Sequence, residues 1–337
     1  MFPLDLAHIW AGLIAFAVLA YVVFDGFDLG IGILFPWLRD RRERHLAMNT
    51  IAPVWDGNET WLVLGGGGLL AVFPLAYAVV MPAVYPLIII MLLGLIFRGV
   101  AFEFTFRTKR AQAFWEWGFA IGSLAAAIAQ GLILGALVQG ITVQDRAFAG
   151  GTWDWATPFS ALCAVAVLIG YATLGAAWLR MKTDGATRVH ATRILRLGLP
   201  ALIAVIGAVS LATVWVRPEY MQRWFSGAGL VWSVIVPVLV VLAGGIAWTA
   251  TRDNDRRVMW PFLGVLALFV LTFTGLGISF YPNIVPPGLT IVEAAAPDTS
   301  LRFLLVGAAV LIPTILAYTA YSYWVFRGVV DPDQGYH

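Results

Sequence analysis

The chain alternates long apolar stretches with short polar segments along its 337 residues. A membrane-spanning α-helix needs roughly 20 apolar residues to cross a bilayer core of about 30 Å. We therefore predict an all-α polytopic membrane protein, a single integral membrane domain over residues 1–337. The nine predicted spans are 8–35, 50–77, 79–104, 114–140, 159–181, 196–216, 229–250, 259–281 and 301–326. Nine helices suit two four-helix bundles plus one peripheral helix, although no internal repeat marks that division.

Prolines complicate the division between the second and third spans. Pro74, Pro82 and Pro86 interrupt a nearly continuous apolar run, and proline lacks the N–H that a helix interior needs. We predict a tight turn near Ala78–Pro82. The first apolar run follows a segment without basic residues, and no small-residue cleavage signal comes after it. We therefore expect a retained helix there rather than a signal peptide.

The basic residues predict how the helices are oriented. All but four of the 21 Lys and Arg residues fall in alternate intervals between spans or after the last one. The exceptions are Arg146, Arg217, Arg223 and Arg302. Because loops on the cytoplasmic side carry the excess of Lys and Arg, the N-terminus is predicted outside and the C-terminus in the cytoplasm.

Composition agrees with a membrane protein and excludes other classes. Hydrophobic residues make up 61% of the chain and charged residues only 12%, whereas soluble domains average about 25% charged. The net charge of +2 is spread over short loops, which argues against nucleic-acid binding. Cys163 is the only cysteine, so neither an intrachain disulfide nor a CxxC metal site can form.

Acidic residues inside the predicted spans are the main candidates for chemistry. Asp25 and Asp28 end the apolar run of the first span, and Asp56 and Glu59 begin the second. Glu103 and Glu116 lie at the end of the third span and the start of the fourth. A charge at the bilayer centre costs at least about 2.5–3.5 kcal/mol, so such residues are seldom idle. With the predicted orientation, all six lie toward the cytoplasmic leaflet.

Spacing suggests how these carboxylates act. Residues three apart share a helix face, so Asp25/Asp28 and Asp56/Glu59 are each predicted to form a local pair able to hold a proton. The functional interpretation is a proton path from the cytoplasm through Asp25, Asp28, Asp56, Glu59 and Glu103. The structural interpretation is that Asp56 caps a helix, while Arg98 neutralises Glu103 or Asp25. Function is favoured for Asp25 and Asp56, and the glutamates stay open.

Glycines predict close helix packing. Gly65–Gly68 in the second span suggests close backbone packing or a local break, since glycine costs about 1 kcal/mol relative to alanine in a helix. Gly131 and Gly135 have the four-residue spacing of small residues in membrane helix contacts.

Cofactor ligands are sparse in the sequence. Haem iron takes axial His, Met, Cys or Tyr ligands. The four histidines are His8 at the outer edge of the first span, His45 and His190 in cytoplasmic loops, and His337. None is placed near the middle of the membrane. We therefore expect no catalytic residue, haem ligand or metal site on this chain itself.

Several motifs together resemble a known family, subunit II of the bacterial cytochrome bd quinol oxidase, cyanide-insensitive type included. Most of them fall in the first 120 residues. They are Asp25-Gly26-Phe27-Asp28-Leu29-Gly30, the run from Ile51 to Trp61, the run from Phe97 to Glu103, Trp115-Glu116-Trp117-Gly118, and the closing Tyr318–Trp324 stretch.

The resemblance implies a heterodimeric quinol oxidase of the bacterial cytoplasmic (inner) membrane that reduces O2 to water. In that family subunit I carries two b haems, haem d and the quinol site, and subunit II has nine helices and no haem ligand. The complex is expected to be electrogenic without pumping. Proton delivery is carried over to Asp25, Asp56 and Glu103, and an O2 path to Trp61. Some relatives have Asp at the position of Glu103.

The resemblance also indicates further ligands and partners. A quinone bound as a structural element and a small single-helix subunit are known in some members, and membrane lipid surrounds the complex. Two other classes stay open. A secondary transporter would use intramembrane acids but usually shows inverted repeats. A purely structural subunit would tolerate substitution of Asp25 and Asp56 as long as the complex assembled.

Overall fold

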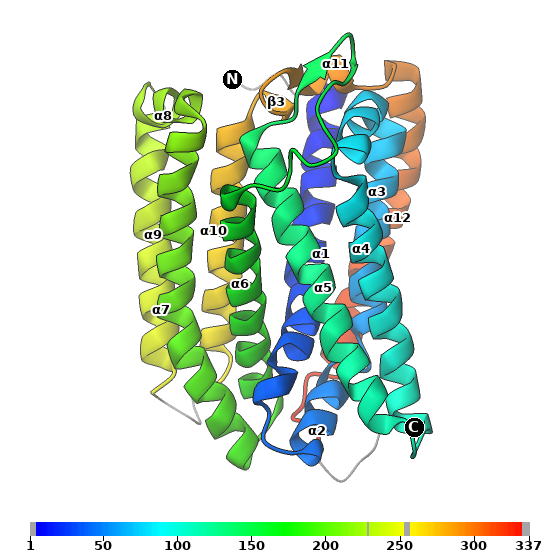
Figure 1. Ribbon diagram of the computed structural model, residues 1–337, viewed down its shortest axis with the longest axis vertical. Coiled ribbons are helices and arrows are strands. Elements are labelled where there is room, and N and C mark those ends of the chain that lie inside the picture. Colours follow the sequence, from blue (N-terminus) through cyan, green and yellow to red (C-terminus); the bar gives the residue numbers. More distant parts are fainter. Residues whose placement is uncertain (1–4, 228, 253–256, 332–337) are drawn as a thin grey trace.

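In an apolar bilayer the backbone can satisfy its hydrogen bonds only within helices or closed barrels, and this chain forms helices. The computed structural model describes residues 5–227, 229–252 and 257–331. The long helices run along one axis of the molecule (Figure 1). They are α1 (Leu6–Leu34), α3 (Trp55–Val72), α4 (Pro74–Arg107), α5 (Gln112–Gln139), α6 (Pro158–Lys182), α7 (Gly185–Val216), α9 (Gly229–Ala250), α10 (Trp260–Phe280) and α12 (Asp298–Val325).

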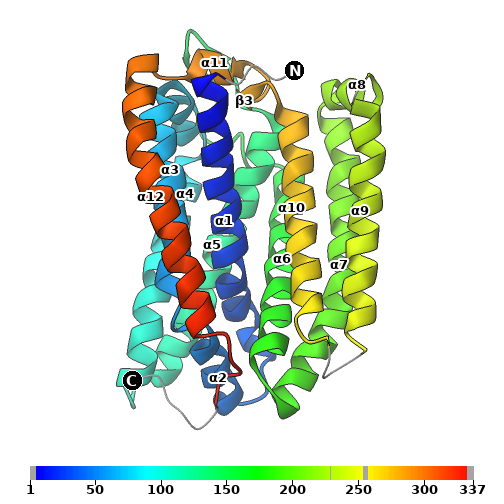
Figure 2. The ribbon, with the colours of Figure 1, turned by 180° about the vertical axis from the view of Figure 1, so that it is seen from behind.

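Short elements close the two ends of the bundle. The end that carries α2 is called the α2 end, and the end that carries α8, α11 and β3 is called the hairpin end (Figures 1 and 2). The short helices are η1 (Phe35–Trp37), α2 (Arg41–Ile51), α8 (Pro218–Phe225) and α11 (Ile291–Ala294). The strands form two antiparallel hairpins, β1 (Val143–Gln144) with β2 (Ala147–Phe148), and β3 (Asn283–Val285) with β4 (Leu289–Thr290).

Eight helices in the described ranges are long and apolar enough to cross a membrane. Among the long helices, α3 is the exception. It has 18 residues, and its first two turns contain Asp56, Asn58 and Glu59, which lower its hydropathy. The helix nevertheless packs against α1 and α4 within the bundle (Figure 1). The predicted count of nine spans therefore depends on α3 alone.

The predicted turn at Ala78–Pro82 is wrong. The chain breaks at Phe73 (φ −123°, ψ 61°), and α4 begins at Pro74. Proline suits the first position of a helix, because its missing N–H would have no partner there and its φ is already helical. Pro82 and Pro86 lie inside α4, where Val84 departs from helical geometry (φ −128°, ψ 18°). A kink within one helix thus replaces the predicted turn.

Two boundaries on the basic side also differ from the predictions. Residues 50 and 51 belong to α2, a helix that the apolar pattern did not indicate because it is strongly charged. Asp40 caps this helix by accepting a hydrogen bond from the Glu43 N–H at 2.8 Å. The span predicted at 196–216 is the apolar part of a longer helix, α7, which starts at Gly185. Charged turns extend both helices beyond the apolar stretches used to locate spans.

Glycines allow the central helices to approach closely. A Cβ added at Gly30 of α1 would lie 2.0 Å from the Tyr171 carbonyl oxygen of α6, and one at Gly175 would lie 2.6 Å from the Gly30 carbonyl carbon. The predicted contact at Gly131 and Gly135 is confirmed, since a Cβ there would lie 2.3 Å and 2.4 Å from Cα atoms of α6. At these points only a hydrogen atom fits between the backbones.

The run Gly65–Gly68 behaves differently. The helix α3 continues through it, so the predicted alternative of a local break is wrong. A Cβ at Gly66 or Gly67 would meet no described atom within 4 Å, and Gly65 and Gly68 face only side chains of α1. Among the described residues, no backbone of another helix therefore packs closely against Gly65–Gly68.

Helix packing places α1, α5 and α6 at the centre. The helix α6 contacts α1, α5, α7 and α10, and 61% of the residues in its most apolar stretch are buried. The helix α12 lies on the outside of the bundle, and only 6% of the residues in its most apolar stretch are buried. The charged α2 and the basic ends of α6 and α7 lie together at the α2 end (Figure 2). Arg256, one of the basic residues used for orientation, lies outside the described residues.

Replacing Gly30 by alanine should strongly destabilise the protein, because the new methyl group would overlap the α6 backbone. We expect the free energy of unfolding to fall by about 2–3 kcal/mol, which is the upper part of the range measured for overpacked sites. The matched control is Gly67→Ala in α3, where open space and the higher helix propensity of alanine predict no loss. Thermal unfolding of the purified protein measures both. Equal stability of the two variants would contradict the packing argument.

Candidate functional site

Arg98 is the buried cation around which the acidic residues gather. It lies on α4 with 1% of its surface exposed, and its Nη1 donates to Asp25 Oδ1 of α1 at 2.8 Å. Asp25 is 0% exposed. The second nitrogen, Nη2, lies 3.6 Å from Glu59 Oε2 of α3. The guanidinium also faces the Trp55 ring at 5.9 Å, so both of its charged neighbours and an aromatic face offset the cost of burial.

Asp28, one turn beyond Asp25, is held by a different set of partners. Its Oδ2 accepts a hydrogen bond from Asn58 Nδ2 of α3 at 2.8 Å. The Asn58 oxygen in turn accepts from the Tyr323 hydroxyl of α12 at 2.8 Å. The chain Tyr323–Asn58–Asp28 therefore joins three helices. Asp25 and Asp28 are both fully buried as a neighbouring pair, but each is oriented by its own partner.

The acidic residues become more buried from the surface inward. Asp56 is exposed on α3 and interacts electrostatically with Glu103 of α4. The Glu103 side chain is 42% exposed and lies 3.7 Å from Arg107. Glu59 is next, with a side chain 29% exposed, and it contacts the buried Arg98. Asp56, Glu103 and Glu59 thus lead from the surface toward the Asp25–Arg98 pair.

These contacts decide between the structural alternatives. Arg98 neutralises Asp25, as one structural interpretation predicted, whereas the cation beside Glu103 is Arg107. Asp56 is the second residue of α3, its N-cap residue is Val54, and no side chain caps that helix end. The prediction that Asp56 caps a helix is therefore wrong. The predicted partner of Glu59 was Asp56, whereas the charged group that Glu59 contacts is the Arg98 guanidinium.

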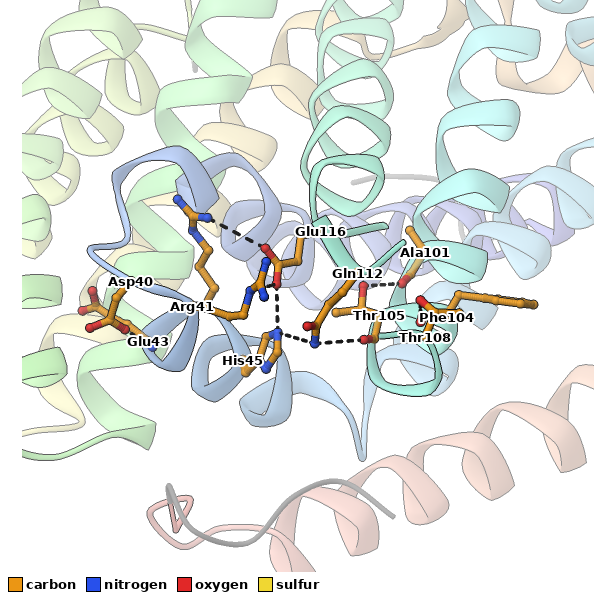
Figure 3. A network of polar contacts seen from close by, with 11 residues as sticks. Asp40, Arg41, Glu43, His45, Ala101, Phe104, Thr105, Thr108, Gln112 and Glu116 are labelled. Atoms are coloured by element: carbon orange, nitrogen blue, oxygen red, sulfur yellow. Dashed lines mark hydrogen bonds and ion pairs between the residues drawn. The ribbon is translucent and has the colours of Figure 1, made fainter. Parts of the chain in front are cut away.

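Glu116 belongs to a separate network at the α2 end (Figure 3). Its Oε1 lies 2.8 Å from Arg41 Nε and 3.0 Å from His45 Nε2, both on α2, and its Oε2 lies 3.9 Å from Arg44 Nη1. Gln112 lies beside His45 and donates to the Thr105 carbonyl oxygen at 3.3 Å. The network fastens α2 to α5, and it involves none of the carboxylates around Arg98.

A third polar group is centred on Gln130 of α5, beside the helical turn of α1 that precedes Asp25. Gln130 of α5 donates through Nε2 to the Tyr21 hydroxyl of α1 at 2.8 Å. Its Oε1 accepts from the Tyr171 hydroxyl of α6 at 2.6 Å. Tyr21 precedes Asp25 by one helical turn. Polar contacts of α1 with α3, α4 and α5, and through Gln130 with α6, therefore meet within two turns of one helix.

Trp61, the candidate for an O2 path, is 1% exposed. Its ring contacts Phe16 edge-on, with centroids 5.6 Å apart, and lies 6.5 Å from Phe24. The indole thus belongs to an apolar cluster between α1 and α3, on the same side of α1 as Tyr21.

Sequence reasoning missed several residues of this site. Asn58 stood inside a predicted span, so its burial cost was a usable signal, as for the aspartates. The tyrosines Tyr21, Tyr171 and Tyr323 gave no such signal, because a tyrosine ring fits an apolar span. Gln130 was visible as a lone amide in the fourth predicted span, but its two partners come from distant parts of the sequence.

The described histidines are engaged near helix ends rather than in the middle of the bundle. His45 faces Glu116, His190 lies 3.0 Å from Glu43 Oε1 of α2, and His8 lies 2.6 Å from Asp5 Oδ1. At the hairpin end, the hydrogen bond from the His8 N–H lowers the pKa of Asp5. No group of three His, Cys, Asp or Glu residues in the described ranges could hold a metal ion. His337 lies outside the described residues.

Comparisons with known proteins agree over nearly the whole chain. Residues 6–326 match the family described as cytochrome bd terminal oxidase subunit II. The cytochrome bd-I ubiquinol oxidase subunit 2 of Escherichia coli K12 is 30% identical over 378 aligned positions, which cover 97% of this chain and 96% of the relative. The cytochrome bd ubiquinol oxidase subunit 2 of Bacillus subtilis 168 is 27% identical and covers 96% of each chain.

A solved structure has the same fold. A chain in the structure of bd oxidase from Geobacillus thermodenitrificans aligns with a TM-score of 0.76, at 19% identity, over 95% of this chain and 98% of that one.

Removing the buried cation should cost far more stability than removing an exposed one on the same helix. Arg98→Gln leaves Asp25 buried without its partner, and we expect a loss of about 3–5 kcal/mol. Arg107→Gln breaks the exposed pair with Glu103 and should cost at most about 1 kcal/mol. Thermal unfolding of both purified variants is the measurement. Similar losses would show that Arg98 is not the central partner assigned to it.

The Tyr323–Asn58–Asp28 chain should behave as one unit. Tyr323→Phe removes a single hydrogen bond and should cost about 1 kcal/mol, whereas Asn58→Leu strands buried Asp28 and half-buried Tyr323 and should cost about 2–3 kcal/mol. In the double variant the losses should not add, because Asn58 mediates both contacts. Denaturant unfolding of the three variants tests this. Additive losses would mean that the two hydrogen bonds are independent.

Proposed function

The chain belongs to the cytochrome bd terminal oxidase subunit II family, and we propose that in this subunit of a bacterial quinol oxidase the acidic residues form a proton-uptake path. The protein is a multi-pass protein of the bacterial inner membrane, and as subunit II it works with a subunit I partner. The observation that carries the proposal is the buried Asp25–Arg98 pair, which Asp56, Glu103 and Glu59 connect to the surface.

The proposed topology places the N-terminus outside and the α2 end in the cytoplasm, with α3 as the ninth span. The concentration of basic residues at the α2 end supports this orientation. The proposed arrangement is two four-helix bundles, α1/α3/α4/α5 and α6/α7/α9/α10, with α12 peripheral and residues 1–337 as one domain. The packing of α4 on α5 and of α9 on α10 and the low burial of α12 support this grouping, and the two groups meet where α1 and α5 pack closely on α6.

Along the proposed path, protons enter at Asp56 and Glu103 and pass by Glu59 to Asp25 and Asp28. In this path the Asp25 carboxylate accepts a proton and releases it again, as positioned carboxylates do in proton transfer. Arg98 stays charged throughout, because the guanidinium does not lose its proton in proteins. Its role is to hold Asp25 in place and to keep an empty acceptor available.

The chemistry itself is assigned to the partner. We propose that this chain is the non-haem subunit and that subunit I holds two b haems, haem d and the quinol site. The haems supply electron transfer and O2 binding. Reduction of one O2 to two water molecules consumes four protons. Drawing them from the cytoplasm, while quinol releases its own outside, makes turnover electrogenic without a pump.

Trp61 and the exposed helix faces are assigned roles toward apolar ligands and partners. The apolar surroundings of Trp61 suit passage of O2, which is an apolar gas. The exposed apolar helix faces suit membrane lipid, a structurally bound quinone and a small single-helix subunit. Quinol and O2 are substrates of the complex rather than of this chain.

A purely structural subunit is the second candidate, and the same contacts favour it. The Arg98–Asp25 pair and the Tyr323–Asn58–Asp28 chain tie helices together whether or not protons move. The two candidates differ in what happens when a carboxylate is neutralised without loss of assembly. Only a proton path then loses turnover.

Asp25→Asn should lower quinol-dependent O2 uptake of the assembled heterodimer by at least about tenfold, because the amide cannot carry the proton; general acid–base groups typically contribute 10²–10⁴-fold. The matched control is Asp145→Asn in the exposed β1–β2 turn, which should keep full turnover. Reduced-minus-oxidised spectra confirm that both variants retain their haems. Unchanged turnover and pH dependence of an assembled Asp25→Asn complex would leave the structural role as the better account.

A further inference from the structure

The hydrogen bonds of the Tyr171–Gln130–Tyr21 group all run in one direction from donor to acceptor. The Tyr171 hydroxyl donates to the Gln130 carbonyl oxygen at 2.6 Å, and the Gln130 amide nitrogen donates to the Tyr21 oxygen at 2.8 Å. Tyr21 accepts this bond, so its own hydrogen remains available for a further acceptor. All donors in the chain therefore point from α6 through α5 toward α1.

Asp25 is the acceptor that this direction indicates. Tyr21 and Asp25 are four residues apart on α1 and lie on the same helix face. The Tyr21 hydroxyl and the Asp25 carboxylate interact electrostatically. Arg98 binds Oδ1 of Asp25, whereas Oδ2 is buried and accepts no hydrogen bond from the described residues in this conformation. The Tyr21 hydroxyl carries the kind of donor that this oxygen lacks.

Packing holds the far end of the chain in place. A Cβ added at Gly26 would lie 2.8 Å from Tyr171 Cε1, so the Tyr171 ring lies directly against α1 beside Asp25. The Tyr171 ring also stacks on Phe269 of α10, with centroids 6.0 Å apart and planes 14° from parallel. Tyr21 is 5% exposed and Tyr171 is 2% exposed. The hydroxyls are thus kept in position by their rings.

We propose that Tyr21, Gln130 and Tyr171 form a hydrogen-bond donor chain that ends on Asp25 and orients its carboxylate for proton uptake. In this role Tyr21 is a positioning residue, and Gln130 and Tyr171 act through it. The chain complements Arg98: the cation binds one carboxylate oxygen and the neutral donors serve the other. The inference rests on the proposed proton role of Asp25.

Other groups also interact electrostatically with Asp25. They come from four further positions besides the donor chain: Asp28 on the same helix, Glu59 of α3, Arg98 of α4 and Tyr323 of α12. None of them changes in a Tyr21→Phe variant. A change in the pH profile of that variant therefore reports on the donor to Asp25.

The experiment compares Tyr21→Phe with Tyr171→Phe and with Tyr85→Phe in the purified heterodimer. Tyr85 is 50% exposed on α4 and serves as the matched control for loss of a hydroxyl. The readout is quinol-dependent O2 uptake as a function of pH, with haem spectra as the check on assembly. A donor to a carboxylate stabilises its ionised form, so without it a proton stays bound to higher pH. A hydrogen bond to a charged group corresponds to roughly 1–2 pH units.

We expect Tyr21→Phe to move the pH profile upward by about 1–2 pH units, Tyr171→Phe to move it less, and Tyr85→Phe not to move it. Tyr21→Phe in the Asp25→Asn background should cause no further movement. A profile of Tyr21→Phe identical to that of Tyr85→Phe overturns the inference, as does a larger effect of Tyr171→Phe, which would mean that the amide points the other way.

The proposed function fails separately from this inference. If Asp25→Asn keeps full turnover, Asp25 carries no proton and the donor chain has nothing to position. If Asp25→Asn abolishes turnover while Tyr21→Phe matches its control, the proton role stands and the donor chain alone is refuted.

Discussion

The need to hold one guanidinium inside an apolar bundle constrains the centre of this structure. A buried cation is tolerated only with a close counter-charge, and Arg98 obtains it from Asp25 at 2.8 Å. That contact requires α1 and α4 to meet at a fixed depth. The close approach of α1 to α6 at Gly30 and Gly175 fixes α1 from its other side. The glycines of the Asp25–Gly30 motif and its acids therefore serve one purpose, which is to place charged groups at a defined position between helices.

The same centre combines features of a rigid core with features of a site. Full burial, stacked rings and bidirectional hydrogen bonds around Asn58 and Gln130 are what a structural polar network needs. A conducting site additionally needs groups that change protonation and a connection to water. In the proposed path this connection runs from exposed Asp56 through half-buried Glu59 to Asp25. Rigidity and transfer are thus compatible, since a proton moves while the heavy atoms stay.

The sequence predicted the class of fold and most helices because the hydrophobic effect acts on long uniform runs. It also predicted the contact of Gly131 and Gly135, where small size alone decides packing. The prediction failed at the prolines, where the residue type alone does not decide the local structure. Pro74 starts α4 after a break at Phe73, whereas Pro82 and Pro86 lie within α4, which kinks at Val84. The acids were found through their cost of burial. Their partners Asn58, Gln130 and Tyr323 come from remote segments, and the pairing of remote segments depends on helix rotation that the residue pattern does not encode.

The loose attachment of α12 has a consequence for how the protein matures. This helix buries little of its surface, yet its Tyr323 completes the polar chain to Asp28. During synthesis α12 follows all the other described helices, so Asp28 and Asn58 must wait without their third partner while the rest of the bundle inserts and packs. The acidic centre is finished only when this last segment docks. The half-buried Tyr323 thereby makes completion of the chain a condition for a fully hydrogen-bonded interior.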